Sequence, residues 1–424
     1  MKTKMTKHAV LSSGAKMWRS LACAKSELRL DLTLACGQTF RWKESAEGHW
    51  TGVMGGRVWT LTQTEDTLWY YVYANPDTQN GRGVSLLDKK RSEKRSVDSR
   101  MKNEEEPHVV TDQQEGEVEA EMMLKDFLQL HVKLGDLYRK WGAADPHFKE
   151  IADIFKGVRI LRQDPTECLF SFICTSNNHI SRIQGMVERL CQALGAPLCQ
   201  LDQTAYYDFP TLSALADSSV EACLRDLGFG YRARFLQQSA KQILDTHGLQ
   251  WLESLRRLPY VEARDALRTL PGVGTKVADC VCLMSLNKSE AVPVDTHVWQ
   301  IAKRDYKYTT DSGQKSLTEK IHRDIGDFFR KLWGPYAGWA HSVLFCADLK
   351  KFQNLKEPAR VKQPKAEKES GKKSKTTKTK REFDGKGEDT KIKSESQKRA
   401  KACVKRQKSF RSHKITHFSD STFN

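Results

Sequence analysis

Two kinds of hydrophobic spacing divide the chain. Between residues 27 and 75, aromatic and β-branched residues alternate with polar ones, as in "HWTGVMGGRVWTLTQTEDTLWYYVY", which is typical of antiparallel strands. The stretch "MGGR" within it predicts a hairpin turn. From about residue 122 to 348 the apolar residues recur at helical spacing, for example in "SRIQGMVERLCQALG". The pattern predicts an α+β protein, with an antiparallel sheet domain at residues 1–121 and a compact helical region at residues 122–350.

Two stretches follow neither pattern. Residues 81–118 are charge-dense and almost free of aromatic residues, which predicts an exposed or disordered insertion. Residues 351–424 hold 23 basic and 9 acidic residues, and their net charge of +14 accounts for most of the +17 of the chain. A disordered basic tail of this kind suits nuclear import or loose contact with a polyanion, or is a solvated tail without a specific role. We expect a nuclear protein, and the lysine-containing, acid-free first 26 residues leave a mitochondrial fraction open.

Composition excludes several classes of protein. No apolar run approaches the length of a membrane span, so we expect no membrane partner. The eleven cysteines are scattered, mostly among apolar residues, and none forms a C-x-x-C pair, which argues against zinc ribbons and fingers and favours a reducing compartment. We also expect a monomer, no cofactor and no catalytic metal.

A proline-entered glycine turn, "LPGVGTKVADCVCLM", predicts a helix–hairpin–helix at about residues 260–286. Gly272 and Gly274 allow positive backbone torsion angles, and Thr275 begins the second helix, with Val277, Val281 and Met284 in the core. The unpaired amides of a helix N-terminus bind phosphate, so this hairpin would place Gly272, Gly274 and Val277 against a DNA backbone. A helical corner whose glycines serve only close packing fits the local sequence equally well.

One lysine and one aspartate make the hairpin a candidate for chemistry. Lys276 lies in the first turn of the second helix, where the helix dipole disfavours a positive charge, and a neutral amine there could form a Schiff base with an aldehydic carbon. Asp295 follows nineteen residues later, before "THVWQIAKR", where it is expected to cap a helix. A carboxylate held in that way could also stabilise a cationic transition state. The two roles are compatible.

The hairpin, this lysine and this aspartate resemble those of the helix-hairpin-helix DNA glycosylases. Further stretches resemble the eukaryotic 8-oxoguanine DNA glycosylases in particular: "SELRLDLTLACGQTFRW", "RQDPTECLFSFICTSNN", "LGFGYRAR", "AVPVDTHVWQIAKRDY" and "LWGPYAGWAHSVLFCADL". The resemblance implies a bifunctional enzyme that excises 8-oxoguanine paired with cytosine in double-stranded DNA and then cuts the abasic strand by β-elimination. Lys276 would attack the anomeric carbon of the sugar, and Asp295 would stabilise its oxocarbenium character.

The resemblance also assigns residues to the base and to the DNA. The backbone carbonyl of Gly37 would accept the N–H that distinguishes 8-oxoguanine from guanine, while Cys280 and Phe345 would sandwich the extruded base. Taken alone, Gly37 is compatible with a bend at a strand end, and the other two with core packing. The residues implied to contact DNA are Asn177 in the gap left by the base, Arg182 and Arg232 on the orphaned cytosine, Tyr231 as a neighbouring wedge, and His297 near a phosphate. Without the resemblance, "GYRAR" reads as a helix start with exposed charges and His297 as a surface histidine.

One position departs from the family. His341 stands where the resemblance calls for a glutamine that contacts the Watson–Crick edge of the base. A neutral imidazole offers one donor and one acceptor, whereas the amide offers two donors and an acceptor. The departure affects base affinity and pH dependence, and it leaves the reaction class unchanged.

Three other functions are less consistent with the chain. Pyrimidine-lesion glycosylases of the superfamily often hold a four-cysteine iron–sulfur cluster, but only Cys346 and Cys403 follow Cys282. Alkylbase glycosylases lack the lysine. A DNA-binding adaptor with a basic tail would leave Lys276, Asp295 and "ACGQTFRW" unexplained.

Overall fold

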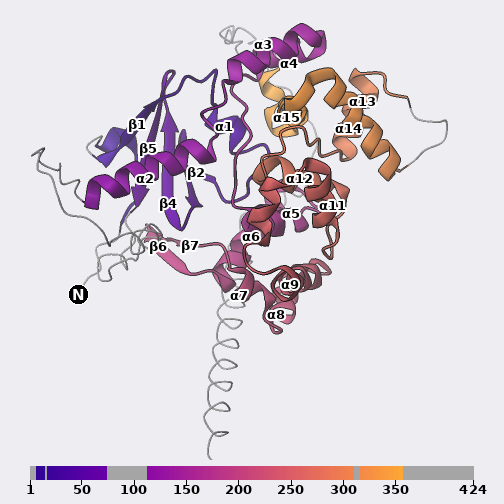
Figure 1. Ribbon diagram of the computed structural model, residues 1–424. Coiled ribbons are helices and arrows are strands. Elements are labelled where there is room, and N and C mark those ends of the chain that lie inside the picture. Colours follow the sequence, from indigo (N-terminus) through magenta and orange to yellow (C-terminus); the bar gives the residue numbers. More distant parts are fainter. Residues whose placement is uncertain (1–5, 15–16, 74–111, 310–315, 357–424) are drawn as a thin grey trace, which may run out of the picture.

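The N-terminal part of the chain forms an antiparallel sheet, at the left in Figure 1. The computed structural model describes residues 6–14, 17–73, 112–309 and 316–356 of the chain. The five strands have the spatial order β1-β5-β4-β3-β2. Their bounds are Arg19–Ala22 (β1), Lys43–Ala46 (β2), His49–Met54 (β3), Arg57–Gln63 (β4) and Thr67–Tyr73 (β5). Together with the helical region that follows, this sheet confirms the predicted α+β class.

The hairpin between β3 and β4 forms as the sequence predicts. Met54 pairs with Arg57, and the two glycines between them have φ values of 58° and 68°. A two-residue turn that matches the twist of its strands needs positive φ at both central positions, which glycine adopts without steric cost.

Each face of the sheet is covered by a different element. Helix α2 (Asp112–Phe127) lies on one face, where its residues share a core with Trp59 and Leu61. On the other face, Val53 and Val58 pack against the small antiparallel hairpin of β6 and β7. That hairpin runs over Pro197–Leu201 and Thr204–Tyr207. Side chains alternate along each strand, so every strand contributes residues to both of these covered faces.

The segment from residue 27 to 42 is not part of the sheet, so the predicted start of the sheet is wrong. The sheet begins earlier, with β1, and this segment holds the short helix α1 (Leu30–Thr33) and an irregular loop. Leu28, Leu30, Leu32 and Leu34 are all buried. Their alternation imitates a strand because the segment is buried on several sides between the sheet and the helical region.

Three further expectations are corrected. The insertion expected at 81–118 lies mainly outside the described residues, but its end is helical, because α2 begins at Asp112. Two acidic residues of α2 pair with basic residues of the sheet, Glu117 with Arg19 and Glu119 with Arg57 at 2.5 Å. The β6–β7 hairpin interrupts the helical region. The first residues of the tail expected from residue 351 belong to η8 (Lys350–Leu355), which buries Phe352; residues 357–424 lie outside the described residues.

The helical region occupies the right and lower parts of Figure 1. Its longer helices are α3 (Leu134–Ala144), α4 (Pro146–Ile154), α5 (Pro165–Ile173), α6 (Ile180–Leu194), α9 (Arg232–Gln242), α11 (Tyr260–Arg268), α12 (Thr275–Ser285), α13 (Thr296–Asp305), α14 (Glu319–Trp333) and α15 (Ala337–Asp348). Shorter elements are η1 (Leu11–Ser13), α7 (Leu212–Ala216), α8 (Val220–Asp226), the π-helix η5 (Ile243–His247), α10 (Trp251–Ser254), η6 (Leu255–Arg257) and η7 (Gly334–Tyr336). Within the described part of the chain, none of the helices has both the length and the apolar character that a membrane crossing requires.

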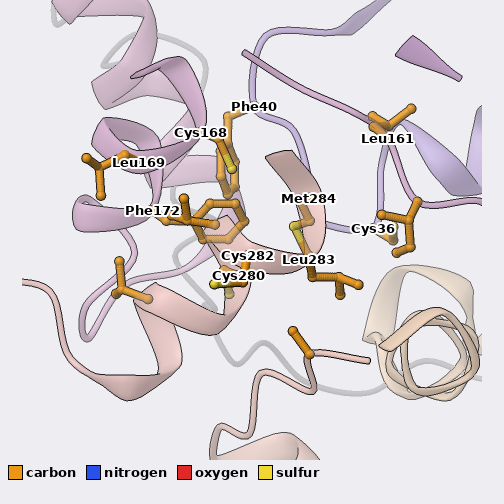
Figure 2. Packing of buried hydrophobic residues seen from close by; sticks show 14 of the residues in the cluster. Cys36, Phe40, Leu161, Cys168, Leu169, Phe172, Cys280, Cys282, Leu283 and Met284 are labelled. Carbon is orange, nitrogen blue, oxygen red and sulfur yellow. The ribbon is translucent and has the colours of Figure 1, made fainter. Parts of the chain in front are cut away.

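Helix α12 lies at the centre of this region. All of its residues from Val277 to Ser285 are buried, which confirms the predicted core positions Val277, Val281 and Met284. Figure 2 shows its side chains, Cys280 among them, close to Phe172 of α5 and to residues of the segment from 36 to 40. The helix that carries Lys276 is therefore held between α5, α11 and the N-terminal part of the chain.

Candidate active site

The predicted helix–hairpin–helix is formed by α11 and α12, and its two glycines differ. Gly272 has a φ of 79°, and a Cβ there would lie 2.6 Å from a ring carbon of Phe235. Gly274 has a φ of −89° and an extended backbone, so the expectation of positive torsion is wrong for it. It is the N-cap of α12, and an N-cap residue adopts extended torsion angles.

The N-terminus of α12 is open to an anion. Gly274 is exposed and has no side chain to cap the first amides of the helix, and the Ala278 amide is the first to bond back, to the Gly274 carbonyl at 3.0 Å. The side chain of Val277 is buried, so only its backbone can face DNA. The geometry is that of a phosphate seat made of backbone amides.

Lys276 projects from the first turn of α12 onto the end of α5. Its Nζ lies 3.3 Å from the Thr175 hydroxyl, to which it donates, and 5.3 Å from the ring centroid of Phe172. The side chain is partly buried. Within the described part of the chain, no carboxylate lies within ion-pairing distance of the amine. The amine is therefore held in place by a hydroxyl and an aromatic face.

Asp295 caps α13, as predicted. Its Oδ1 accepts hydrogen bonds from the amides of His297 at 2.9 Å and Val298 at 3.0 Å. Both bonds go to the same oxygen, and in the described residues nothing donates to Oδ2. The cap thus orients the carboxylate and leaves one oxygen available to a substrate.

Cys280 lies one helical turn after Lys276 and is buried. Burial raises the pKa of its thiol to about 11, although the nearby Lys276 ammonium acts in the opposite direction. The thiol is therefore neutral at physiological pH. It offers a soft, apolar surface, as a contact with the face of a base requires.

Helix α15 brings His341 and Phe345 to the same site. The two rings are 6.2 Å apart between centroids, and the Phe345 ring is 6.0 Å from that of His297. His341 is buried, and neither ring nitrogen has a hydrogen-bond partner within the described chain. Burial lowers the pKa of His341 to about 4, and the charges of Asp295 and Lys276 also act on it, with opposite signs. The neutral imidazole thus lies close to both candidate reactive groups.

Gly37 lies in a tightly bonded loop at the edge of this site. Its φ is 86°, and a Cβ would lie 3.0 Å from Cδ1 of Ile180, so the position favours glycine. The preceding Cys36 lies close to Cys346, which follows Phe345 in α15, and the Cys346 thiol lowers the pKa of Cys36. The loop is therefore adjacent to the helix that carries Phe345.

Three of the residues assigned to the DNA duplex, Asn177, Tyr231 and Arg232, meet at the loop from residue 175 to 177. Tyr231 is half exposed and donates to the Ser176 carbonyl at 3.3 Å. Arg232 is buried and donates to the carbonyls of Ser176 and Asn177, so the alternative of exposed charges is wrong for it. Asn177 has a left-handed φ of 48° and is exposed. This loop includes Thr175, which contacts Lys276.

Arg182 and His297 lie at the surface. Arg182 is exposed in the first turn of α6. The imidazole of His297 is 53% exposed, and its Nδ1 lies 3.4 Å from Oδ2 of Asp348, which also pairs with Arg304 at 3.0 Å. His297 is thus a surface histidine with a carboxylate neighbour.

Sequence reasoning missed two features of the site. Thr175, which holds the amine of Lys276, has no signature in the sequence. A buried hydrogen-bonded group of Tyr260, Asp279 and His322 lies behind α12. Its signal was visible, because Asp279 interrupts the apolar run "VADCVCLM".

Two family models match the chain in succession. Residues 20–169 match the N-terminal domain of 8-oxoguanine DNA glycosylase. Residues 170–326 match the HhH-GPD superfamily of base excision DNA repair proteins. The second match includes the hairpin, Lys276 and Asp295.

Relatives and solved structures agree with these models. The chain is 36% identical over 351 residues to an N-glycosylase/DNA lyase OGG1 of Arabidopsis thaliana, covering 82% of this chain and 84% of the relative. It is 34% identical to an N-glycosylase/DNA lyase of Saccharomyces cerevisiae, covering 78% and 85%. The fold is similar to that of the Clostridium acetobutylicum 8-oxoguanine glycosylase/lyase bound to double-stranded DNA containing cytosine opposite 8-oxoG, with a TM-score of 0.59, 25% identity and coverage of 77% and 93%.

Proposed function

The chain belongs to the 8-oxoguanine DNA glycosylase family, and from this premise we propose that it excises 8-oxoguanine opposite cytosine and cleaves the abasic strand through a lysine Schiff base. The family and its named relatives support a DNA N-glycosylase with lyase activity. The observation that supports the proposal is that Lys276 and Asp295 both lie near Cys280 and His341. The amine is bonded only to the Thr175 hydroxyl among the described residues, and one oxygen of the carboxylate is available.

In the proposed reaction Lys276 is the nucleophile. As the bond between C1′ and the base breaks, its electron pair leaves with the base, which takes up a proton, and the lysine nitrogen forms a bond to C1′. Opening of the sugar ring gives an imine between Lys276 and C1′. Loss of a C2′ proton then expels the 3′ phosphate by β-elimination. The Asp295 carboxylate stabilises positive charge at C1′ and accepts or returns protons during these steps.

The remaining side chains would hold the extruded base and the DNA. Cys280 and Phe345 provide the two faces of a base pocket, Gly37 a backbone carbonyl and His341 a neutral edge. Extrusion costs a few kcal/mol of unstacking and unpairing. Asn177, Arg182, Tyr231 and Arg232 would fill and read the vacated duplex, and Gly272, Gly274 and Val277 would hold a phosphate at the start of α12.

Borohydride trapping tests the proposal. The protein is incubated with duplexes that carry 8-oxoguanine opposite each of the four bases, and reduction of the imine gives a stable protein–DNA adduct. We expect the adduct to form most efficiently opposite cytosine and to be absent from Lys276→Gln. Lys241→Gln, which changes an exposed lysine of α9, is the matched control and should form the adduct normally. Adduct formation by Lys276→Gln would refute the assignment of the nucleophile, and no adduct with any duplex would favour a DNA-binding adaptor.

We also propose that the basic C-terminal segment directs the chain to the nucleus, because it carries most of the net positive charge. Removal of residues 357–424 should leave adduct formation intact and reduce the nuclear fraction of a fluorescent fusion. An unchanged nuclear fraction would contradict this assignment.

A further inference from the structure

Three buried polar side chains from three helices meet behind the candidate nucleophile. The Tyr260 hydroxyl of α11 donates to Oδ1 of Asp279 at 2.7 Å, and Nε2 of His322, in α14, lies 2.7 Å from Oδ2. Asp279, in α12, is 1% exposed. Both oxygens of its carboxylate are thus bonded, each to a different helix. We call these three residues the Asp279 group.

Selection for stability alone would not favour the Asp279 group over apolar residues at the same positions. Transfer of a carboxylate from water to a protein interior costs several kcal/mol, and well-packed apolar residues of similar volume are often as stable as a buried pair or more so. Its neighbours in α12, Ala278 and Val281, are apolar and fully buried. An apolar residue at position 279 would continue this core.

The position of Asp279 connects it to the chemistry. It follows Lys276 by three residues and immediately precedes Cys280. At about 100° of rotation per residue, the Asp279 side chain lies about 60° from Lys276 around the helix axis, on the side away from Cys280. Tyr260 of α11 and His322 of α14 bond to α12 on that side, whereas Lys276 and Cys280 belong to the candidate site. Two directional bonds therefore fix both the rotation and the axial position of α12, which apolar packing specifies less sharply.

We propose that the Asp279 group is a positioning unit for Lys276, which holds α12 in the one rotation that directs the amine at the sugar carbon. The inference rests on the proposed function, since it assumes that Lys276 is the nucleophile. A displacement of a reacting group by about 1 Å reduces a rate by about 100-fold. Loss of the Asp279 group should therefore lower the rate of adduct formation. It should leave the affinity for DNA nearly unchanged, because other surfaces bind the DNA.

The triple variant Tyr260→Phe/Asp279→Leu/His322→Leu separates positioning from stability. Because it replaces the whole group by apolar residues, we expect it to unfold at the same urea concentration as the wild type or a higher one. Its affinity for the lesion duplex should remain within about twofold, whereas its single-turnover rate of adduct formation should fall by at least about tenfold. A rate within twofold of the wild type overturns the inference.

Single substitutions keep the inference testable if the triple variant does not fold. His322→Gln retains an N–H donor toward Asp279 and should react at nearly the wild-type rate. His322→Leu removes the donor and should slow adduct formation several-fold at temperatures far below its unfolding transition. Equal rates for these two variants would show that the bond to His322 does not position Lys276.

A readout that needs no reaction separates failure of this inference from failure of the proposed function. The Cε resonance of 13C-labelled Lys276, assigned by its loss in Lys276→Gln, reports the surroundings of the amine. We expect it to shift in the triple variant and to remain in place in Lys241→Gln. If the wild type forms no adduct with any lesion, the proposed function fails; an unshifted resonance in the triple variant refutes the positioning role in either case.

Discussion

Two deeply buried polar side chains, Arg159 and His341, show opposite uses of a polar group. Arg159 lies where the N-terminal segment meets α2 and α3, and its side chain is 1% exposed. It donates to the Glu27 carboxylate at 2.9 Å and to the carbonyls of Gln129 at 2.6 Å and Val132 at 2.5 Å. His341 is 6% exposed and has no hydrogen-bond partner for either ring nitrogen within the described chain.

This difference in hydrogen bonding distinguishes a residue that stabilises the fold from one that is available to a ligand. Each buried polar atom without a partner costs about 1–3 kcal/mol, so folded proteins rarely keep one unless something else uses it. The bonds of Arg159 are complete within the chain, which makes it part of the scaffold. Those of His341 are missing within the described residues, as the proposed contact with a base requires. Two other groups of the candidate site are also incompletely hydrogen-bonded. Lys276 makes one long hydrogen bond, and only one oxygen of the Asp295 carboxylate is bonded.

The largest effect is expected for Arg159, whose hydrogen bonds are complete within the chain. Arg159→Met removes the guanidinium but leaves Glu27 and the carbonyls in place, and we expect a loss of about 3–5 kcal/mol in the free energy of unfolding. Urea denaturation measures it. Arg139→Met, in which the arginine side chain is 79% exposed, serves as the control and should change stability by less than about 0.5 kcal/mol. A loss below 1 kcal/mol at position 159 would remove the contrast with His341.

Asp295→Asn tests whether a capping carboxylate also takes part in the reaction. The amide oxygen can still accept from His297 and Val298, so folding and DNA binding should change little. Loss of the charge should slow base excision by about 100- to 1,000-fold in single-turnover assays. Asp164→Asn makes the same change at the N-cap of α5 and should leave the rate nearly unaltered. If both variants lose activity equally, capping explains the role of Asp295.

Acid should destabilise the chain through His341. Its pKa in the fold is about 4, compared with an ordinary value of 6.5. Between these values the unfolded chain binds more protons than the folded chain, so the free energy of unfolding falls as the pH falls from about 6.5 to about 4. This one group accounts for about 3 kcal/mol of that loss, from the rule of 1.36 kcal/mol per pKa unit. Urea denaturation at several pH values should show a shallower dependence for His341→Gln, and an identical dependence would contradict the assignment.

The smallest effect is expected for His341→Gln at neutral pH. Both side chains offer a donor and an acceptor to a base edge, so affinity for the lesion duplex should change by less than about tenfold, the scale of one hydrogen bond. Equilibrium titration with a duplex that resists cleavage measures this change. A greater loss would show that the imidazole is specifically adapted to its ligand. His341→Leu, which offers neither group, should bind more weakly than the glutamine variant.

The sequence predicted the parts of the site that local rules govern. The hairpin, the N-cap at Asp295 and the core positions of α12 follow from glycine, aspartate and apolar spacing, and the structure confirms them. The same rules gave the wrong torsion angle for Gly274, because an N-cap residue is extended. They also predicted a strand in the segment from 27 to 42, because its leucines are buried on several sides and alternate as they would in a strand. Contacts between distant segments were beyond these rules. Nothing near Thr175 or His322 in the sequence indicates that each would meet α12.

The two glycines of the hairpin differ in mutational tolerance. In a saturation scan read out by folding, position 272 should accept almost nothing, because any side chain would meet the Phe235 ring in addition to a backbone that resists substitution. Position 274 should fold well with serine, threonine, asparagine or aspartate, which are the preferred N-cap residues. Read out by DNA binding, the same four should separate, with aspartate the poorest, since its charge repels a phosphate. A motif written with two equivalent glycines thus conceals one requirement of the fold and one of the ligand.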